Sequence, residues 1–269
     1  LEGSYNVTYT VTDSSGNIVM ATRQVSVTDP FVDPCNSGEI QNYCDIDVDE
    51  INFSGTVTDI DGNTYNYISY NSSDWTVDDA LTETYRDGTP IPEVWEINEW
   101  NDLTTGAWQY ENNDPTKSKL YNAYAVAGIH DNDPSTPNKE FAPEGWHVPS
   151  EYEWQNLVQY SRDTYGDFFV KALSSSTGWN CSSEPFSPGY NQITNNCSGF
   201  NATPLEQAGS SSFQNTSGQT WHMWLGSGQN FGANLPQSGI TFYLNVSTGI
   251  GSSGIGLAFG GYAVRFVKD

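Results

Sequence analysis

The sequence has few basic residues, very little methionine and no long apolar run. Lysine and arginine together number 9 against 33 aspartate and glutamate residues, and the formal net charge is −24. Such a charge repels nucleic-acid phosphates and anionic lipid surfaces, so we expect no nucleic acid as a partner. No apolar stretch reaches the roughly 18 residues that a membrane-spanning helix needs, and we expect no direct membrane insertion.

The sequence also lacks the short motifs of common enzymes. It contains no Gly-x-Ser-x-Gly nucleophile elbow, no His-Glu-x-x-His zinc helix and no Walker phosphate loop. Its histidines, His130, His147 and His222, are scattered along the chain. We therefore expect a protein that is not an enzyme and that needs no cofactor except, at most, calcium.

Polar uncharged and aromatic residues take the place of the missing charges. Aromatic residues make up 14% of the chain and charged residues 16%, whereas soluble domains average about 25% charged residues. A surface of Asn, Ser, Thr, Gln and Gly with interleaved aromatic rings has the chemistry of antibody recognition surfaces. The chain shows neither an initial Met nor a signal peptide, so we expect residue 1 to lie inside a longer, secreted or cell-surface precursor.

The four cysteines fall into two close pairs, Cys35 with Cys44 and Cys181 with Cys197. Four cysteines allow three connectivities, and we predict pairing by proximity. Neither pair has the C-x2-C spacing of a zinc site, which favours disulfides in an oxidising compartment over metal binding.

The first 29 residues alternate apolar and polar side chains. Tyr5, Val7, Tyr9 and Val11 fall on one face, turn residues follow, and the pattern resumes from residue 18 to 27. This pattern predicts a β-hairpin. The segment is similar to the last two strands of a bacterial immunoglobulin-like domain, so we assign 1–29 to such a sandwich.

Residues 30–54 form an acidic linker that carries the first cysteine pair. The acidic run 45–50 within it is either a solvated loop or a calcium ligand set.

One stretch, 149–165, carries a strong helix pattern. Ser150 and Glu153 have the spacing of a capping box, and a shorter helix is predicted over 167–173. The stripe predicted to be buried consists of Trp154, Leu157, Val158 and Ser161.

Six sequence blocks occur in a fixed order. They are 57–65, 85–92, 120–126, 143–150, 198–202 and 261–269. Together they closely resemble the Fibrobacter succinogenes major paralogous domain. The resemblance implies that 55–269 forms an α+β, C-type-lectin-like domain with a twisted antiparallel sheet, few helices and a central strand over 264–267. It also favours a structural hydrogen-bonding role for His147 over that of a base.

The sequence departs from the family pattern at two cysteine positions. Family members often carry Cys before the Pro-x-Gly-Trp block and in the last strand, where this chain has Phe141 or Ala142 and Phe266. The resemblance therefore implies that an apolar contact replaces a disulfide here. Formylglycine-generating chemistry, known in the same fold, would need reactive cysteines, which nothing marks in this sequence.

The resemblance places the expected ligand site at 221–248, because the C-terminal region forms the recognition surface in related lectin-like proteins. Aromatic and amide side chains interleave there and suit sugars or protein epitopes, although strand alternation directs about half of the aromatics to the core. The candidate contacts are Trp221, Trp224, Gln229, Asn230, Phe231, Asn234, Gln237, Tyr243 and Asn245.

Two segments offer oxygen ligands for calcium. Residues 59–65 form either a cation loop or, as Asp-Gly-Asn favours, a hairpin turn. Asp131, Asp133 and Glu140 lie in an insertion between family blocks, where an exposed rigid loop is the alternative.

Two functions fit these observations. The first is a cell-surface adhesion or binding module that recognises a glycan or protein ligand on another surface. The alternative is a structural subunit of an extracellular filament, self-assembled through the N-terminal strands.

Overall fold

The computed structural model describes residues 3–27, 51–205, 218–226, 238–245, 251–257 and 260–269, and only the backbone at 3, 26–27, 238–245 and 251–257. The chain divides into two units, Leu1–Ser37 and Gly38–Asp269. This division falls inside the predicted linker.

The first unit is the predicted hairpin. Strand β1 (Gly3–Thr12) pairs antiparallel with β2 (Ile18–Val27) over their whole length. The Asp13 carboxylate accepts hydrogen bonds from the backbone N–H groups of Ser15 and Asn17, both at 2.8 Å. Gly16 supplies the positive φ of 85° that the turn requires.

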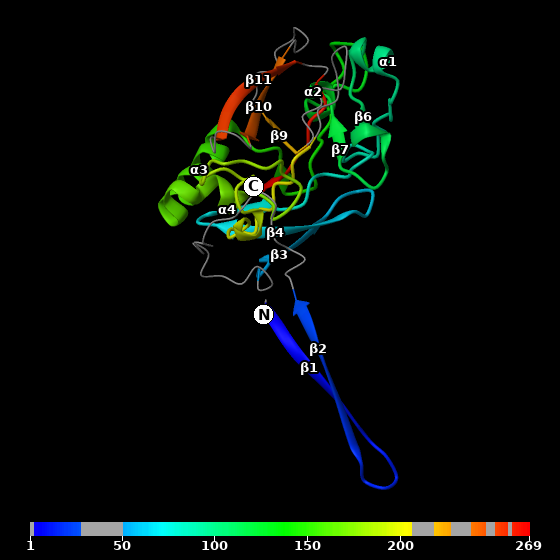
Figure 1. Ribbon diagram of the computed structural model, residues 1–269. Helices are drawn as coiled ribbons and strands as arrows, with labels where there is room; N and C mark the ends of the chain where they lie inside the picture. The colour runs from blue at the N-terminus through cyan, green and yellow to red at the C-terminus, as the bar shows by residue number, and fades with distance from the viewer. Residues whose placement is uncertain (1–2, 28–50, 206–217, 227–237, 246–250, 258–259) are drawn as a thin grey trace. The chain divides into compact units, whose positions relative to one another are not determined.

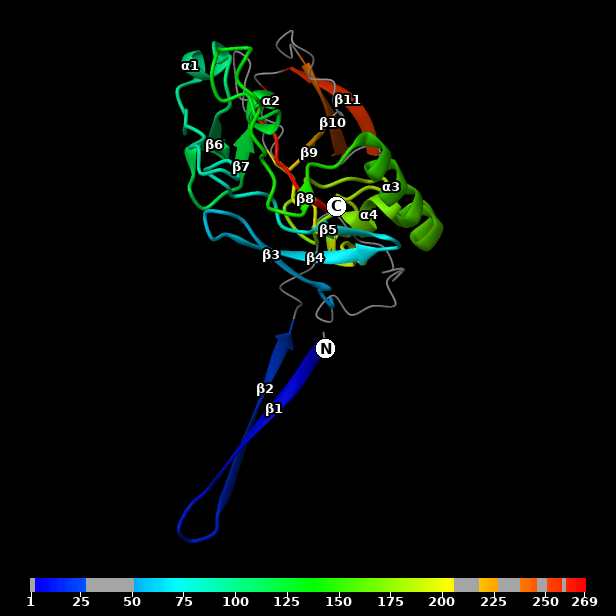
Figure 2. The ribbon, with the colours of Figure 1, turned by 180° about the vertical axis from the view of Figure 1, so that it is seen from behind.

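In the part of the second unit that the structure describes, the strands form three antiparallel sheets (Figures 1 and 2). The largest has the order β3-β4-β5-β12-β8, with bounds Gly55–Thr58, Thr64–Tyr70, Ser73–Thr76, Val267–Lys268 and Trp146–His147. The second has the order β11-β10-β9, with bounds Gly251–Leu257, Ser238–Asn245 and Thr220–Leu225. The third pairs β6 (Trp108–Tyr110) with β7 (Lys119–Tyr121).

Among the described residues the helices are few and mostly short, which confirms an α+β fold. They are α1 (Ile97–Asn101), α2 (Ala123–Val126), α3 (Glu151–Tyr165) and α4 (Phe169–Leu173). The short 3-10 turns are η2 (Glu111–Asn113), η3 (Gly166–Phe168) and η4 (Gln192–Thr194). The predicted second helix thus begins as a 3-10 turn, η3, before α4.

Helix α3 begins as the sequence predicts. Ser150 caps it and forms both hydrogen bonds of the capping box with Glu153. Trp154, Leu157 and Ser161 are buried, and Val158 packs partly against the same core. In both views α3 and α1 lie at opposite edges of the second unit (Figures 1 and 2).

The last ten residues run between two hydrophobic clusters. Tyr262, Val264 and Phe266 belong to one cluster, whereas Ala263 and Val267 belong to the other. Successive side chains of an extended segment point to opposite sides, so this segment buries side chains on both faces, the charged Arg265 among them. The structure bears out the predicted C-terminal strand only in part: β12 (Val267–Lys268) overlaps the predicted range 264–267 at a single residue, although it lies inside the sheet, between β5 and β8.

The predicted apolar replacement for a family disulfide is also present. The rings of Phe141 and Phe266 lie with their centroids 6.0 Å apart. Both side chains are buried in the same cluster, so an aromatic contact connects the residue just before β12 to the segment before β8.

Candidate ligand-binding groove

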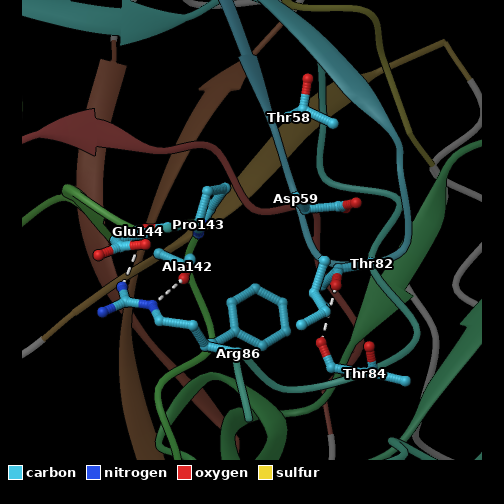
Figure 3. Close-up of a pocket in the computed structure, with 10 residues that line it drawn as sticks. Thr58, Asp59, Thr82, Thr84, Arg86, Ala142, Pro143 and Glu144 are labelled. Atoms are coloured by element: carbon cyan, nitrogen blue, oxygen red, sulfur yellow. Dashed lines mark hydrogen bonds between the residues drawn. The ribbon is translucent and has the colours of Figure 1, made fainter. Parts of the chain in front are cut away.

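A small hollow lies where the segment after β5 meets the loop that leads to β8 (Figure 3). Its volume is about 210 Å³, below the roughly 300–1,000 Å³ of typical small-molecule sites. The Arg86 Nε donates a hydrogen bond to the Ala142 carbonyl at 2.9 Å, and its Nη2 donates to the Pro143 carbonyl at 2.9 Å. The guanidinium therefore fastens this loop.

Two carboxylates near the hollow, those of Asp59 and Asp61, are also engaged within the protein. Asp61 accepts hydrogen bonds from the hydroxyls of Thr82 at 3.0 Å and Thr84 at 2.6 Å. Burial alone raises the pKa of Asp61, but these and neighbouring backbone hydrogen bonds lower it overall. Asp59 accepts from Asn63 and Tyr65, which confirms the predicted hairpin turn at 59–65. We interpret this hollow as a structural junction.

His147 lies between two carboxylates. Its Nε2 is 2.8 Å from a Glu153 oxygen and its Nδ1 is 2.7 Å from an Asp269 oxygen. The hydrogen bond to Glu153, outweighing partial burial, raises the pKa of His147 to about 9. The Ser150 hydroxyl donates to Glu153 at 2.7 Å rather than to the imidazole, so His147 is not the base for that hydroxyl. The expected structural role of His147 fits this geometry.

This bridge predicts a loss of stability at alkaline pH. The raised pKa means that the folded state favours the charged imidazolium. Its contribution is therefore full below the ordinary pKa of 6.5 and is lost as the pH rises through about 9. The side chain is 40% exposed, so we expect a loss of less than about 1 kcal/mol. The contribution of the bridge is measured by urea unfolding of wild type and His147→Gln from below pH 6.5 to above pH 9. A stability difference between the two proteins that does not shrink with rising pH would contradict the prediction.

The structure corrects the predicted ligand site at two residues. Trp221 is 0% exposed and Trp224 is 1% exposed, so neither can contact a ligand in this conformation. Trp221 packs edge-on to Phe200 at 5.7 Å, and the Trp224 indole N–H donates to the Tyr121 carbonyl at 2.7 Å. Strand β9 is packed on both faces, which buries both indoles.

The side chains of the other predicted ligand contacts are not described. Gln229, Asn230, Phe231, Asn234 and Gln237 lie outside the described residues. Tyr243 and Asn245 lie in β10, where they pair with His222 and Thr220 along the backbone. Their contact with a ligand stays a prediction.

The calcium prediction at Asp131, Asp133 and Glu140 is wrong in its geometry. The described residues contain no group of three His, Cys, Asp or Glu side chains suited to a metal ion. Asp131 instead accepts a hydrogen bond from the Asp133 N–H at 3.0 Å, and Asp133 accepts from the Ser135 N–H at 2.9 Å. These carboxylates shape the loop through local turns, which supports the rigid-loop alternative.

The cysteines are described in part. Cys181 and Cys197 are both disulfide-bonded, and no cysteine among the described residues is a free thiol. Cys35 and Cys44 lie outside the described residues, as does the acidic run 45–50. Pairing by proximity therefore stays a prediction.

A larger groove lies between the turn from β4 to β5 and helix α3. Its volume is about 460 Å³, within the range of small-molecule sites. Asn71 adopts a φ of 57° in this tight turn, a conformation that asparagine tolerates better than most residues. The residues that line the groove are Tyr70, Asn71, Ser72, Ser73, Trp75, Asn156, Leu157, Gln159, Tyr160 and Asp163. We call it the α3 groove.

The α3 groove combines a fixed aromatic wall with unused polar groups. The Tyr70 hydroxyl donates to the Ser198 carbonyl at 3.1 Å, and the Tyr70 ring lies 5.9 Å from the ring of Tyr160. In the described part of the chain, the side chains of Asn71 and Asn156 form no hydrogen bond with another residue. Amide groups beside aromatic rings can bind an uncharged polar ligand.

Sequence reasoning missed this groove because its two walls are far apart in the chain. The helix pattern drew attention to the buried stripe of α3 and left the opposite stripe as a solvent face. The signal was nevertheless present. Asn156, Gln159 and Asp163 recur at spacings of three and four residues on that polar face, with Tyr160 beside them.

Comparison with known proteins gives one family match. A family model described as the Fibrobacter succinogenes major domain matches residues 68–268, which is most of the chain and includes both walls of the α3 groove. No curated protein and no solved structure matches the chain.

Proposed function

Because the chain belongs to the Fibrobacter succinogenes major domain family, and the matched segment contains the α3 groove, we propose that it is an extracellular cell-surface binding module whose ligand site is this groove. The proposal rests on the side-chain amides of Asn71 and Asn156. They form no hydrogen bond with another described residue, and they line the same groove as the Tyr70 and Tyr160 rings. Side chains that are partnered only by water are available to a ligand.

The extracellular location is proposed from composition and cysteine chemistry. Disulfide-bonded Cys181 and Cys197 suit an oxidising compartment. The net charge of −24 favours solubility. A separate finding, which does not bear on location, is that no described helix is long and apolar enough to cross a membrane.

The finer fold assignments belong to the same proposal. A C-type-lectin-like fold for 55–269 is supported by the sheet in which β3, β4 and β5, from the start of the domain, share neighbours with the C-terminal β12. An immunoglobulin-like origin for the hairpin is supported by its two ten-residue strands.

A binding role is proposed in preference to catalysis. The α3 groove is lined by amides, hydroxyls, aromatic rings and a single carboxylate, Asp163. Catalysis by a nucleophile needs a general base within hydrogen-bond reach of it. Asp163 instead accepts a hydrogen bond from the Gln159 amide at 2.8 Å.

The test compares two neighbouring residues of α3. Asn156 lines the groove, whereas Gln155 is exposed outside it. Purified wild type, Asn156→Ala and Gln155→Ala are applied to an array of glycans and cell-surface proteins. We expect Asn156→Ala to weaken binding about fivefold to tenfold, the effect of one lost hydrogen bond, and Gln155→Ala to bind as wild type does. Equal binding by all three proteins would exclude the groove as the ligand site.

A second candidate function, filament assembly, is favoured by the apolar face of the hairpin. The strand register places Tyr9 opposite Ala21 and Val11 opposite Val19, and Tyr9, Val11 and Val19 are exposed. A two-stranded ribbon with an open apolar face is stabilised when that face is covered. We propose that hairpins of neighbouring copies cover one another in an extracellular filament.

Light scattering distinguishes this second candidate from the first. Assembly predicts a mass above the 29.6 kDa of one chain, which Tyr9→Asp reduces to that of a monomer. Thr8→Asp, on the opposite face, should assemble as wild type does. A wild-type monomer at high concentration would exclude assembly through the hairpin.

A further inference from the structure

Helix α3 carries a polar stripe that continues past the groove. Asn156, Gln159 and Asp163 line the groove, and Tyr152 lies four residues before Asn156 on the same side of the helix. Tyr152 is 72% exposed. From Tyr152 to Asp163 the stripe extends about 16 Å along the helix axis.

We propose that the α3 groove binds a neutral glycan chain that runs along α3 and stacks a sugar ring on Tyr152. This inference rests on the proposed function and names the ligand class of the same site. An extended ligand is indicated because the exposed ring lies beyond the groove and in line with it.

The side chains along the stripe have the chemistry that sugar hydroxyls require. Each free amide offers donors and an acceptor together, and each sugar hydroxyl does the same, so an amide can bond two neighbouring hydroxyls. The Asp163 carboxylate, already accepting from Gln159 at 2.8 Å, keeps further acceptor sites. Tyrosine rings offer rigid flat surfaces for the apolar face of a sugar ring at low entropic cost.

The charge of the groove selects against acidic glycans. Its lining contains the Asp163 carboxylate and no Lys, Arg or His side chain. An anionic sugar would meet this carboxylate and the field of a chain with net charge −24. A neutral glycan meets no such repulsion.

The strand pairing leaves little room for a peptide bound as an added strand. Such a peptide needs an exposed sheet edge with unpaired backbone groups. Beside the groove, β3 pairs with β4 only over 64–67, which leaves the three residues 68–70 of β4 open on that side, and β12 pairs with β5 only at Trp75. The edges that remain are short, so the groove offers mainly side chains to a ligand.

The experiment is native affinity electrophoresis of the full chain. The gels contain mixed-linkage β-glucan or galactomannan as neutral probes, or polygalacturonate as the anionic probe. We expect retardation of wild type by at least one neutral probe and none by polygalacturonate. Tyr152→Ala should weaken that interaction about tenfold, the effect of one lost stacking contact. Trp95→Ala removes another exposed aromatic ring, one that does not line the groove, and should migrate as wild type does.

Circular dichroism establishes that the variants are folded, and because Tyr152 is largely exposed its loss should leave the fold intact. Retardation by polygalacturonate alone, or by no probe, would overturn the inference, as would a neutral interaction that Tyr152→Ala leaves unchanged. Groove-dependent binding to proteins on the array, without retardation by the neutral polysaccharides, would overturn this inference and leave the proposed binding function standing.

Discussion

Replacing Arg265 by methionine will lower the free energy of unfolding by about 3–5 kcal/mol, because it leaves a buried carboxylate without its partner. The Arg265 side chain is 2% exposed, and its Nε lies 2.8 Å from an oxygen of Asp79, which is 11% exposed. The guanidinium also lies 4.3 Å from the centre of the Phe200 ring and donates to the Phe200 carbonyl. Methionine keeps much of the apolar volume but satisfies neither acceptor.

Two further variants distinguish the effect of the unpaired buried carboxylate from an unspecific loss of stability. Arg265→Met combined with Asp79→Asn should recover part of the lost stability, since no unpaired charge is left inside. Lys268→Met removes a more exposed ion pair, 3.4 Å from Asp74, and should lower stability by less than about 1 kcal/mol. Urea unfolding followed by tryptophan fluorescence measures all three. A loss for Arg265→Met no larger than that for Lys268→Met would refute the account.

Features that depend on neighbouring residues were predictable from the sequence. The capping box of α3 uses Ser150 and Glu153, and the turn at 59–65 uses Asp59 and Asn63. In each case the donor and acceptor are within four residues, so the local pattern determines the contact. The alternation of β1 and β2 predicted the hairpin for the same reason.

The burial of Trp221 and Trp224 depends on two separate hydrophobic clusters, so the local sequence pattern could not predict it. Strand alternation sends the two indoles to opposite faces, and a sheet with one solvent face would expose one of them. Here Trp221 belongs to the cluster around Trp154 and Trp224 to the cluster around Tyr121. Both faces are therefore covered, and the predicted recognition surface loses its two largest rings.

The α3 groove shows why an exposed polar stripe is ambiguous in a sequence. Asn156 and Gln159 are ordinary residues for a solvated helix face. They line a groove only because the β4–β5 turn, with Asn71 and Ser72, lies opposite them. The two segments are far apart in the chain, so their meeting is a property of the folded sheet.

Replacing Gly128 by alanine will lower the free energy of unfolding by about 2–5 kcal/mol, because a positive φ and a steric clash act together. Gly128 has a φ of +74°, and a Cβ there would lie 1.9 Å from the Lys139 carbonyl oxygen. The backbone is held at this point, since the Lys139 N–H donates to the Gly128 carbonyl at 2.8 Å. Alanine must therefore open the base of the loop that carries Asp131 and Asp133.

Gly145→Ala is the matched control for this prediction. Gly145 has a φ of +77° and nothing within 4 Å of its added Cβ, so only the backbone strain of about 1–2 kcal/mol applies. The difference between the two variants in urea unfolding isolates the clash with Lys139, which we expect to be about 1–3 kcal/mol. Equal losses for Gly128→Ala and Gly145→Ala would mean that the loop moves aside freely. The close backbone contact between Gly128 and Lys139 would then contribute nothing to holding residues 130–139 in place.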